Sequence, residues 1–161
     1  MVKLGVIGAG RIGRLFIENI ATRVRTARIE AVADIHLDAA RAATERFGVP
    51  VVTPDYRTLL ENPAIDAVLI CSATDTHLPL IRAVAASGKH VFCEMPIGVD
   101  VPDIERTLEV VARAGVKLQI GFNRRFDPSF AKAREMIAAG KVGTPQLVRV
   151  TSRDPAPPPI E

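Results

Sequence analysis

Residues 4–13 of the chain read LGVIGAGRIG, and residues 11–21 continue them as RIGRLFIENIA. The first four letters form a short apolar run, which is typical of a strand that is covered on both faces. Gly8, Gly10 and Gly13 have the spacing G-x-G-x-x-G, and apolar side chains then recur at helical intervals. A strand, a glycine-rich turn and a helix in this order predict the first unit of a parallel α/β sheet.

Each glycine of this turn has a physical reason. One makes the turn tight, one lets a pyrophosphate approach the backbone, and one lets the helix pack closely on the strand. The helix that starts at Arg11 also presents free N–H groups and a partial positive charge to an anion. The motif therefore predicts a dinucleotide site, and a tight turn that binds nothing is the alternative. The predicted residues are Gly8, Gly10, Arg11, Ile12 and Gly13.

Strand-like runs alternate with helical patterns as far as about residue 121. We expect strands at residues 3–7, 28–34, 51–52, 66–70, 90–93 and 117–120. Glycine follows three of the helical patterns between them, at positions 48, 88 and 115, and suits the left-handed residue just past a helix end. This order predicts an α/β fold over residues 1–121, a doubly wound parallel sheet of the Rossmann type.

The pattern changes after residue 121. Residues 127–140 have an Asp cap, a proline at the first helical position and a final glycine, so they predict a helix. Residues 146–153, QLVRVTSR, read as a strand, and residues 154–161 are proline-rich. We expect residues 122–145 to be a helical connector and residues 146–161 to be the first strand and proline-rich remnant of a second domain whose sheet is essentially absent. An unpaired strand at residues 146–152 also allows a homodimer by edge pairing.

Asp34 ends the second predicted strand, 21 residues after Gly13. A carboxylate at this distance can accept hydrogen bonds from both ribose hydroxyls of an adenosine and would repel a 2′-phosphate. The next residues, beginning with Ile35, supply no arginine that would offset this repulsion. The pattern therefore predicts NAD in preference to NADP, with Asp34 and Ile35 at the cofactor. The same position of Asp34 is also compatible with a cap on the following helix.

Two further strand ends complete the predicted site, because ligands bind outside the carboxyl ends of strands in open α/β sheets. Small side chains that let a cofactor lie close to the backbone follow the fourth strand: Ser72, Ala73 and Thr74. His77 either caps the next helix or touches the dinucleotide. The fifth strand ends in VFCEMP, residues 91–96, so Glu94 and Met95 are expected to face the nicotinamide.

The composition is that of a globular protein, with 48% hydrophobic and 24% charged residues among 161. The net charge is only +3, there is no long Lys/Arg run, and aromatic residues are 4%, so we expect no nucleic-acid partner. No apolar run approaches the ~18 residues of a membrane span, and no basic-then-apolar leader opens the chain. Two cysteines, Cys71 and Cys93, are too few for a disulfide framework or a closed zinc site. We expect a cytoplasmic protein without membrane or metal, whose two thiols are free.

Taken together, these segments resemble the N-terminal half of the glucose–fructose oxidoreductase/inositol dehydrogenase family, also called Gfo/Idh/MocA, and within it the inositol 2-dehydrogenases. The resemblance covers essentially the whole chain. It is carried by VIGAGRIG, VADIHLDAA, VLICSATDTH, HVFCEMPIG, GFNRRFDPSFAKARE and GKVGTPQLVRVTSRDP. It implies hydride transfer between a carbon of a polyol or sugar substrate and NAD. It also implies a Glu-Lys-Pro motif after the fifth strand, whose lysine orients the substrate hydroxyl and assists proton transfer.

Glu94 and Pro96 match this motif, but position 95 is methionine. Met95 keeps the unbranched reach of a lysine stem and has no ammonium group or titratable proton. By the same resemblance, Asn123 and Arg124 lie near the nicotinamide and the substrate. The alternative for Arg124 and its neighbour Arg125 is a solvated pair beside nearby carboxylates.

The family also places an Asp and a His, four residues apart, in its second domain as proton-transfer partners. None of His36, His77 and His90 has an aspartate four residues before it. We therefore expect the NAD-binding domain of an inositol 2-dehydrogenase-like enzyme, truncated and with little or no turnover. The alternative is a non-catalytic NAD-binding or self-associating module.

Overall fold

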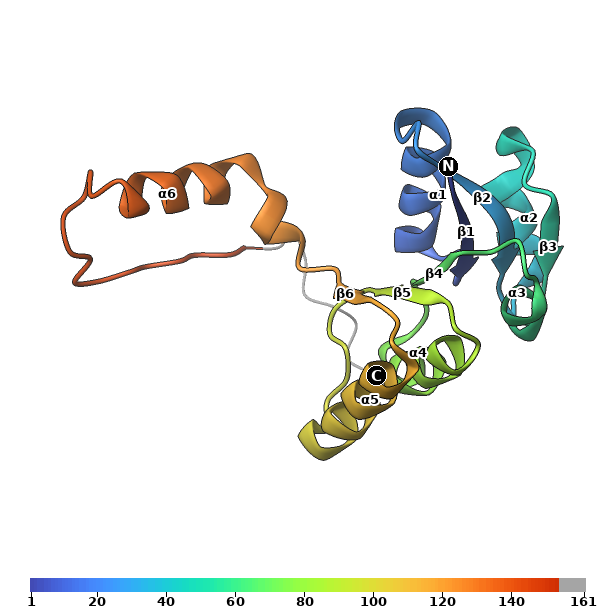
Figure 1. Ribbon diagram of the computed structural model, residues 1–161. Coiled ribbons are helices and arrows are strands. Elements are labelled where there is room, and N and C mark those ends of the chain that lie inside the picture. Colours follow the sequence, from blue (N-terminus) through green and yellow to red (C-terminus); the bar gives the residue numbers. More distant parts are fainter. Residues whose placement is uncertain (154–161) are drawn as a thin grey trace. The chain divides into compact units, whose positions relative to one another are not determined.

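The computed structural model describes residues 1–153. The chain divides into two units, Met1–Phe122 and the residues from Asn123 onward, and each is described by itself. In the first unit, six strands form one sheet in the order β3-β2-β1-β4-β5-β6 (Figure 1). The strands are β1 (Val2–Ile7), β2 (Ala27–Ala33), β3 (Val51–Thr53), β4 (Ala67–Ile70), β5 (His90–Cys93) and β6 (Leu118–Ile120).

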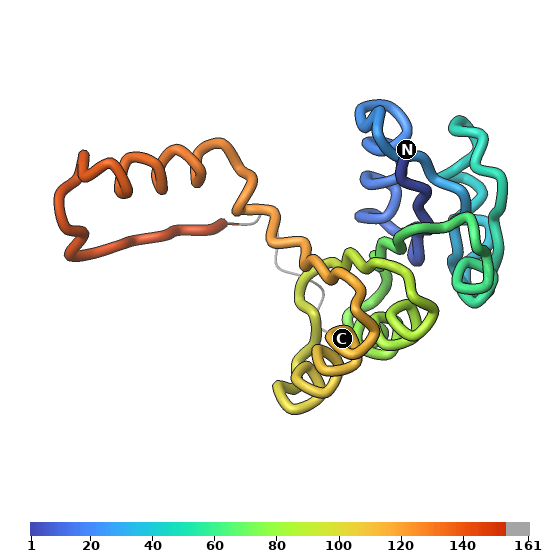
Figure 2. The backbone as a smooth tube through the Cα atoms, viewed as in Figure 1, coloured from blue at the N-terminus to red at the C-terminus, as the bar shows by residue number. Residues whose placement is uncertain are grey.

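All five pairings in this sheet are parallel. The backbone runs from β1 outward to β2 and β3, and then returns past β1 to continue with β4, β5 and β6, as can be followed in Figure 2. The strand order therefore reverses between β1 and β4, and this switch point is where such sheets open a ligand crevice. Each strand begins and ends within one residue of its predicted position, so the predicted doubly wound Rossmann fold is confirmed.

The helices of the first unit follow the predicted signals. They are α1 (Arg11–Arg23), α2 (Leu37–Thr44), α3 (Arg57–Glu61), α4 (His77–Ala86) and α5 (Val101–Ala114), with short 3-10 turns η1 (Glu45–Phe47) and η2 (Thr74–Thr76). The clearest case is α5. The Asp100 side chain accepts a hydrogen bond from the N–H of Asp103, Pro102 lies in the first turn, and Gly115 ends the helix at φ 67°. Such caps satisfy backbone groups that the helix itself leaves unpaired.

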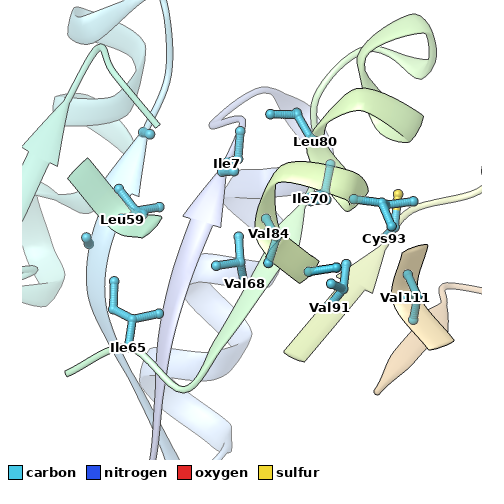
Figure 3. Packing of buried hydrophobic residues seen from close by; sticks show 14 residues of the cluster. Ile7, Leu59, Ile65, Val68, Ile70, Leu80, Val84, Val91, Cys93 and Val111 are labelled. Carbon is cyan, nitrogen blue, oxygen red and sulfur yellow. The ribbon is translucent and has the colours of Figure 1, made fainter. Parts of the chain in front are cut away.

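The two faces of the sheet have separate cores, because side chains alternate along each strand. Leu4 and Val6 of β1 belong to a cluster that α1 and α2 cover. Ile7 of the same strand belongs to the other cluster, with side chains of α3, α4 and α5. Figure 3 shows this second cluster, in which Val84 of α4 and Val111 of α5 pack over the strands. Both faces are therefore buried, as the apolar strand sequences predicted.

The second unit contains η3 (Asn123–Phe126) and α6 (Pro128–Ala138) in its described part. The predicted helix is confirmed, and its cap Asp127 accepts hydrogen bonds from the N–H groups of Ser129 (2.8 Å) and Phe130 (3.2 Å). The strand predicted at residues 146–152 does not form: residues 145–153 are in neither a helix nor a strand. A strand needs a neighbour for its N–H and C=O groups, and the described residues of this unit contain no other strand.

The predicted proline-rich end, residues 154–161, lies outside the described residues. The assignment of residues 122–145 to a connector and of residues 146–161 to a second domain stays a prediction. Within residues 1–153, no helix has both the length and the apolar character that crossing a bilayer requires.

Candidate functional site

The glycine loop joins β1 to α1 and is built by close contacts. Gly8 has φ 95°, and a Cβ atom there would lie 2.7 Å from the carbonyl carbon of Cys71 and from the nitrogen of Ser72. A Cβ atom on Gly13 would overlap the carbonyl oxygen of Gly8. Gly10 differs, because a Cβ atom there meets nothing within 4 Å. Two glycines are thus needed for packing, while the third faces open space in which a ligand can approach the backbone.

The first turn of α1 lies directly behind this open space. Gly10 is its N-cap residue, with extended backbone at φ −68° and ψ −164°, and no side chain caps the helix. The first turn, which begins with Arg11 and Ile12, contains no acidic residue. Its N–H groups and its partial positive charge therefore fit a phosphate, in agreement with the chemistry that the motif predicted.

Asp34 fastens the end of β2 to the glycine loop. Its Oδ2 atom accepts a hydrogen bond from the N–H of Ala9 (2.6 Å), and its Oδ1 atom accepts one from the N–H of His36 (2.7 Å). His36 is itself the N-cap residue of α2, so Asp34 binds the turn before the helix and does not cap it. Each carboxylate oxygen keeps a second lone pair, which can accept a ribose hydroxyl.

A cavity of about 620 Å³ opens beside Asp34 and the glycine loop. It lies at the carboxyl ends of β1 to β4, and its walls are mostly apolar. Its lining residues are Ile7, Gly8, Gly10, Ala33, Asp34, Ile35, His36, Pro54, Tyr56, Cys71, Ser72, Ala73, Asp75, Thr76, Pro79 and Leu80. Apolar walls suit a flat base, and the carboxylate and the helix end suit a ribose and a phosphate, so the residues fit an adenine dinucleotide.

Six predicted residues line this cavity: Gly8, Gly10, Asp34, Ile35, Ser72 and Ala73. Thr74 begins η2, outside the lining, and Arg11, Ile12 and Gly13 form the first turn of α1. Sequence reasoning missed Pro54 and Tyr56, which follow β3. The rule that ligands bind at carboxyl ends of strands would have found them. It also missed Pro79 and Leu80, which face the cavity from the side of α4.

The segment after β5 holds the remaining predicted residues of this unit. The Oε1 atom of Glu94 lies against Gly121, where a Cβ atom would come within 2.8 Å of it. The Oε2 atom of Glu94 accepts a hydrogen bond from the N–H of Met95 (3.3 Å). The side chain of Met95 is not packed into a core, because the residue is 51% exposed. Glu94 and Met95 thus directly follow the fifth strand, and their contact with the nicotinamide stays a prediction.

His77 occupies a place that neither prediction described. It is the first residue of α4, after the N-cap Thr76, and is 2% exposed. Its Nδ1 atom lies 2.8 Å from the carbonyl oxygen of Pro96, and its Nε2 atom lies 3.0 Å from that of Ser72. Capping is therefore wrong, because the ring binds carbonyl groups and not helix N–H groups. The ring is also absent from the lining of this cavity, and its predicted contact with the cofactor stays a prediction.

The two thiols are chemically quiet. Burial, together with the negative charge of Glu94, raises the pKa of Cys71 and of Cys93 from 9.0 to about 12, so both stay protonated at neutral pH. The two side chains belong to the cores on opposite faces of the sheet. Among residues 1–153, no group of three or more His, Cys, Asp or Glu side chains could hold a metal ion.

In the second unit, Asn123 and Arg124 lie in η3. The guanidinium of Arg124 stacks over the ring of Phe130, 5.2 Å from its centroid, and donates a hydrogen bond to the Oγ atom of Ser152 (3.4 Å). These partners are a ring and a hydroxyl and not the carboxylates of a solvated pair. The contacts of Asn123 and Arg124 with nicotinamide and substrate stay predictions.

The sequence profile of the Gfo/Idh/MocA family, an oxidoreductase family with an NAD-binding Rossmann fold, matches residues 2–122. The chain belongs to this family. Its relatives include the myo-inositol 2-dehydrogenase of Thermotoga maritima, which is 44% identical over 160 residues. That alignment covers 99% of this chain and 48% of the relative. The predicted resemblance is confirmed.

Solved structures of the family have the same fold. A probable dehydrogenase from Thermotoga maritima superposes with a TM-score of 0.93 at 44% identity, over 98% of this chain and 47% of that chain. The scyllo-inositol dehydrogenase of Lactobacillus casei, solved with NAD(H) and scyllo-inositol, superposes with a TM-score of 0.84 at 38% identity. That match covers 89% of this chain and 42% of that chain. The chain thus spans about half the length of the relatives that it matches, and this half includes their NAD-binding Rossmann fold.

Proposed function

We propose that this chain binds NAD as the cofactor-binding part of an inositol 2-dehydrogenase-like oxidoreductase. Such an enzyme moves a hydride between a carbon of a polyol or sugar and the nicotinamide. One observation carries the proposal: the Asp34 carboxylate, bonded to the N–H of Ala9 at 2.6 Å, stands between an apolar cavity and the uncapped start of α1. A base, a ribose and a pyrophosphate need these three environments in this order. The names of the inositol dehydrogenase relatives support the substrate class.

In this proposal the adenosine lies in the cavity, and Asp34 accepts hydrogen bonds from its ribose hydroxyls. The pyrophosphate lies on the first turn of α1, against the open side of Gly10. The nicotinamide then points toward the end of β5, near Glu94 and Met95. The carboxylate of Asp34 disfavours a 2′-phosphate, so NAD binds more tightly than NADP.

We also propose that the chain has little or no turnover. General acid–base assistance is worth about 10²–10⁴ in rate. Met95 stands at the lysine position of the family motif, and its thioether can neither donate nor accept the substrate proton at neutral pH.

Calorimetric titration tests the cofactor part. NAD, NADP and ADP-ribose are each added to the folded chain, and NAD and ADP-ribose are expected to bind more tightly than NADP. A folded sample that binds none of the three would refute the proposal. Turnover is tested separately by following NADH absorbance with NAD and myo- or scyllo-inositol.

The turnover measurement is made on three proteins: the present chain, Met95→Lys, and Met95→Lys extended by the second half of the Thermotoga maritima relative. Activity is expected only in the extended lysine form. Rapid NADH formation by the unchanged chain would show that Met95 does not limit catalysis.

One observation favours self-association as a second function. Every residue from 122 to 153 is exposed, and these include Phe126 (68%), Leu147 (87%) and Val148 (72%). Large apolar side chains on an extended segment favour pairing with the same segment of a second copy. Sedimentation velocity over a hundredfold concentration range tests this. A dimer that Val148→Lys dissociates is expected, and a monomer at every concentration would contradict it.

A further inference from the structure

His77 is a buried histidine that the proposed cofactor site does not use directly. Its ring lies between two segments that follow neighbouring strands, and both ring nitrogens face carbonyl oxygens. We infer that His77 is a positioning residue: it ties the segment after β5 to the segment after β4 and so fixes residue 95 beside the nicotinamide. This inference deepens the proposed NAD binding and rests on it.

The ring continues the connection between the two strands where their backbone pairing ends. Strands β4 and β5 pair from Ala67 and His90 up to Ile70 and Cys93. The N–H of Glu94 then donates to the carbonyl of Ile70 (3.0 Å), and the two segments diverge. Beyond this bond, the His77 ring reaches the carbonyl of Pro96 on one side and that of Ser72 on the other. The His77 side chain thus links the two segments at the point where the next backbone hydrogen bond between β4 and β5 would otherwise lie.

A second contact fixes the same segment on α4. A Cβ atom on Gly98 would lie 2.7 Å from the Cδ1 atom of Leu78, which is 6% exposed and is the next residue after His77. Ile97, between Pro96 and Gly98, packs against the core of this face. The first turn of α4 therefore holds residues 96–98 by one polar and one apolar contact. Met95, directly before them, is 51% exposed on the ligand edge.

Few side chains could make this connection. Carbonyl oxygens only accept hydrogen bonds, so the group between them has to donate. The imidazole has two nitrogens on different sides of a rigid ring; in the neutral ring one is an N–H donor and the other an acceptor, and both donate only in the imidazolium. An amide of Asn or Gln donates from one nitrogen only, and its oxygen would face the second carbonyl. The rigid ring of His77 spans the two carbonyls and donates to the one that faces its N–H.

The segment after β4 has further support of its own. The Oγ atoms of Ser72 and Thr76 are 2.6 Å apart, and Thr76 also donates to the carbonyl of Ala73 (2.6 Å). Ser72 and Ala73 line the adenosine cavity, whereas Pro96 does not. Removal of the ring is thus expected to displace the segment after β5, which contains Met95 and Pro96, more than the residues that line the cavity. Binding of the nicotinamide end should suffer, and binding of the adenosine end should not.

The experiment compares NAD with ADP-ribose, which lacks the nicotinamide ring, on the full 161-residue chain. His77→Phe keeps a ring and removes both ring nitrogens, and His77→Gln restores an N–H donor group. The matched control is Ser87→Ala, which removes a hydrogen bond to the carbonyl of Val84 (2.8 Å) at the other end of α4, away from the cavity.

We expect His77→Phe to weaken NAD roughly 3- to 10-fold, as for the loss of one ordinary hydrogen bond, while ADP-ribose changes less than about twofold. His77→Gln should lie between it and the unchanged chain, and Ser87→Ala should leave both ligands unaffected. An equal loss for both ligands, or no loss, from a folded His77→Phe protein would overturn the inference. If the unchanged chain binds neither ligand, the proposed function itself fails.

A spectroscopic measurement keeps the inference open to test if His77→Phe does not fold. Long-range ¹H–¹⁵N NMR spectra of the unchanged chain report which nitrogen of each histidine ring carries a proton. The N–H of the His77 ring is expected on Nδ1, where it donates to the carbonyl of Pro96. A bare Nδ1 atom would show that the ring does not hold this segment.

Discussion

The carboxylate of Asp34 is expected to stabilise both the fold and the bound cofactor. The substitution Asp34→Asn measures both contributions, because it removes the charge of this side chain and keeps its shape. The two oxygens each accept a backbone N–H, from Ala9 at 2.6 Å and from His36 at 2.7 Å. Asparagine has the same shape but only one oxygen. Whichever way the amide turns, its NH₂ group faces one of these two N–H donors. One hydrogen bond is then lost, and the other loses its charge.

The magnitude follows from these two bonds. A hydrogen bond to a charged group contributes roughly 1.5–3 kcal/mol, and a neutral one about half as much. We therefore expect Asp34→Asn to lower the free energy of unfolding by about 2–4 kcal/mol, or Tm by roughly 5–15 °C for a chain of this length. The lost interaction with the ribose should weaken NAD roughly 10- to 100-fold. NADP should weaken less, because the repulsion of the 2′-phosphate disappears together with the charge.

Urea denaturation gives the stability, and calorimetry with NAD and NADP gives the affinities. Asp38→Asn is the matched control, because it removes the same charge from a fully exposed side chain in the first turn of α2. It should change stability by less than about 0.5 kcal/mol and leave NAD binding unaffected. If Asp34→Asn unfolds at the same urea concentration and binds NAD as tightly as the unchanged chain, the Asp34 carboxylate does not hold the loop or the ribose.

Three further predictions concern single positions. Gly10→Ala should fold normally and lose NAD binding, because its Cβ atom fills only the open ligand side. Gly13→Ala should instead lower the free energy of unfolding by about 1–3 kcal/mol, because its Cβ atom overpacks the turn. Urea melts and NAD titrations that do not distinguish the two variants would contradict this. The protonated Cys71 and Cys93 stabilise the fold below their unfolded pKa of 9.0, and this contribution is lost as the pH rises toward 12. At about pH 10.5 the loss of unfolding free energy is about 2 kcal/mol per thiol. Urea unfolding of the unchanged chain and of the double alanine variant, each at pH 8 and at pH ~10.5, measures this loss as the difference between the two proteins. Met95→Lys should shift the urea midpoint negligibly because residue 95 is 51% exposed, and a large shift would show a hidden packing role.

Most of the fold could be predicted because its signals are local. The apolar run before Gly8 and the glycine at the end of α5, Gly115, are signals that short stretches of sequence contain, and both lie where they were expected. The same holds for Gly10 and Asp34, since a motif fixes their spacing along the chain and the fold then fixes it in space. These are the residues that line the observed cavity.

The role of His77 could not be predicted, because its partner Pro96 is 19 residues away and only the pairing of β4 with β5 brings them together. Residues 146–152 show the opposite error. Their alternating apolar pattern is that of a strand, but a strand forms only where a neighbour offers its backbone groups. Sequence periodicity reports the side chains and contains no information about that neighbour.

In the proposed function, the cofactor site tolerates methionine at position 95, where the resemblance implies a lysine. Residues 96–98 are held by His77 and Leu78 of α4, and Glu94 is fixed by its contacts at the ends of β5 and β6. Neither set of contacts involves the side chain of residue 95, which is half exposed. The fold is therefore compatible with either a lysine or a methionine at position 95. The choice between them affects only contacts with a bound substrate. The proposed loss of proton transfer at this position therefore need not weaken NAD binding, and the two properties can be measured separately in the same protein.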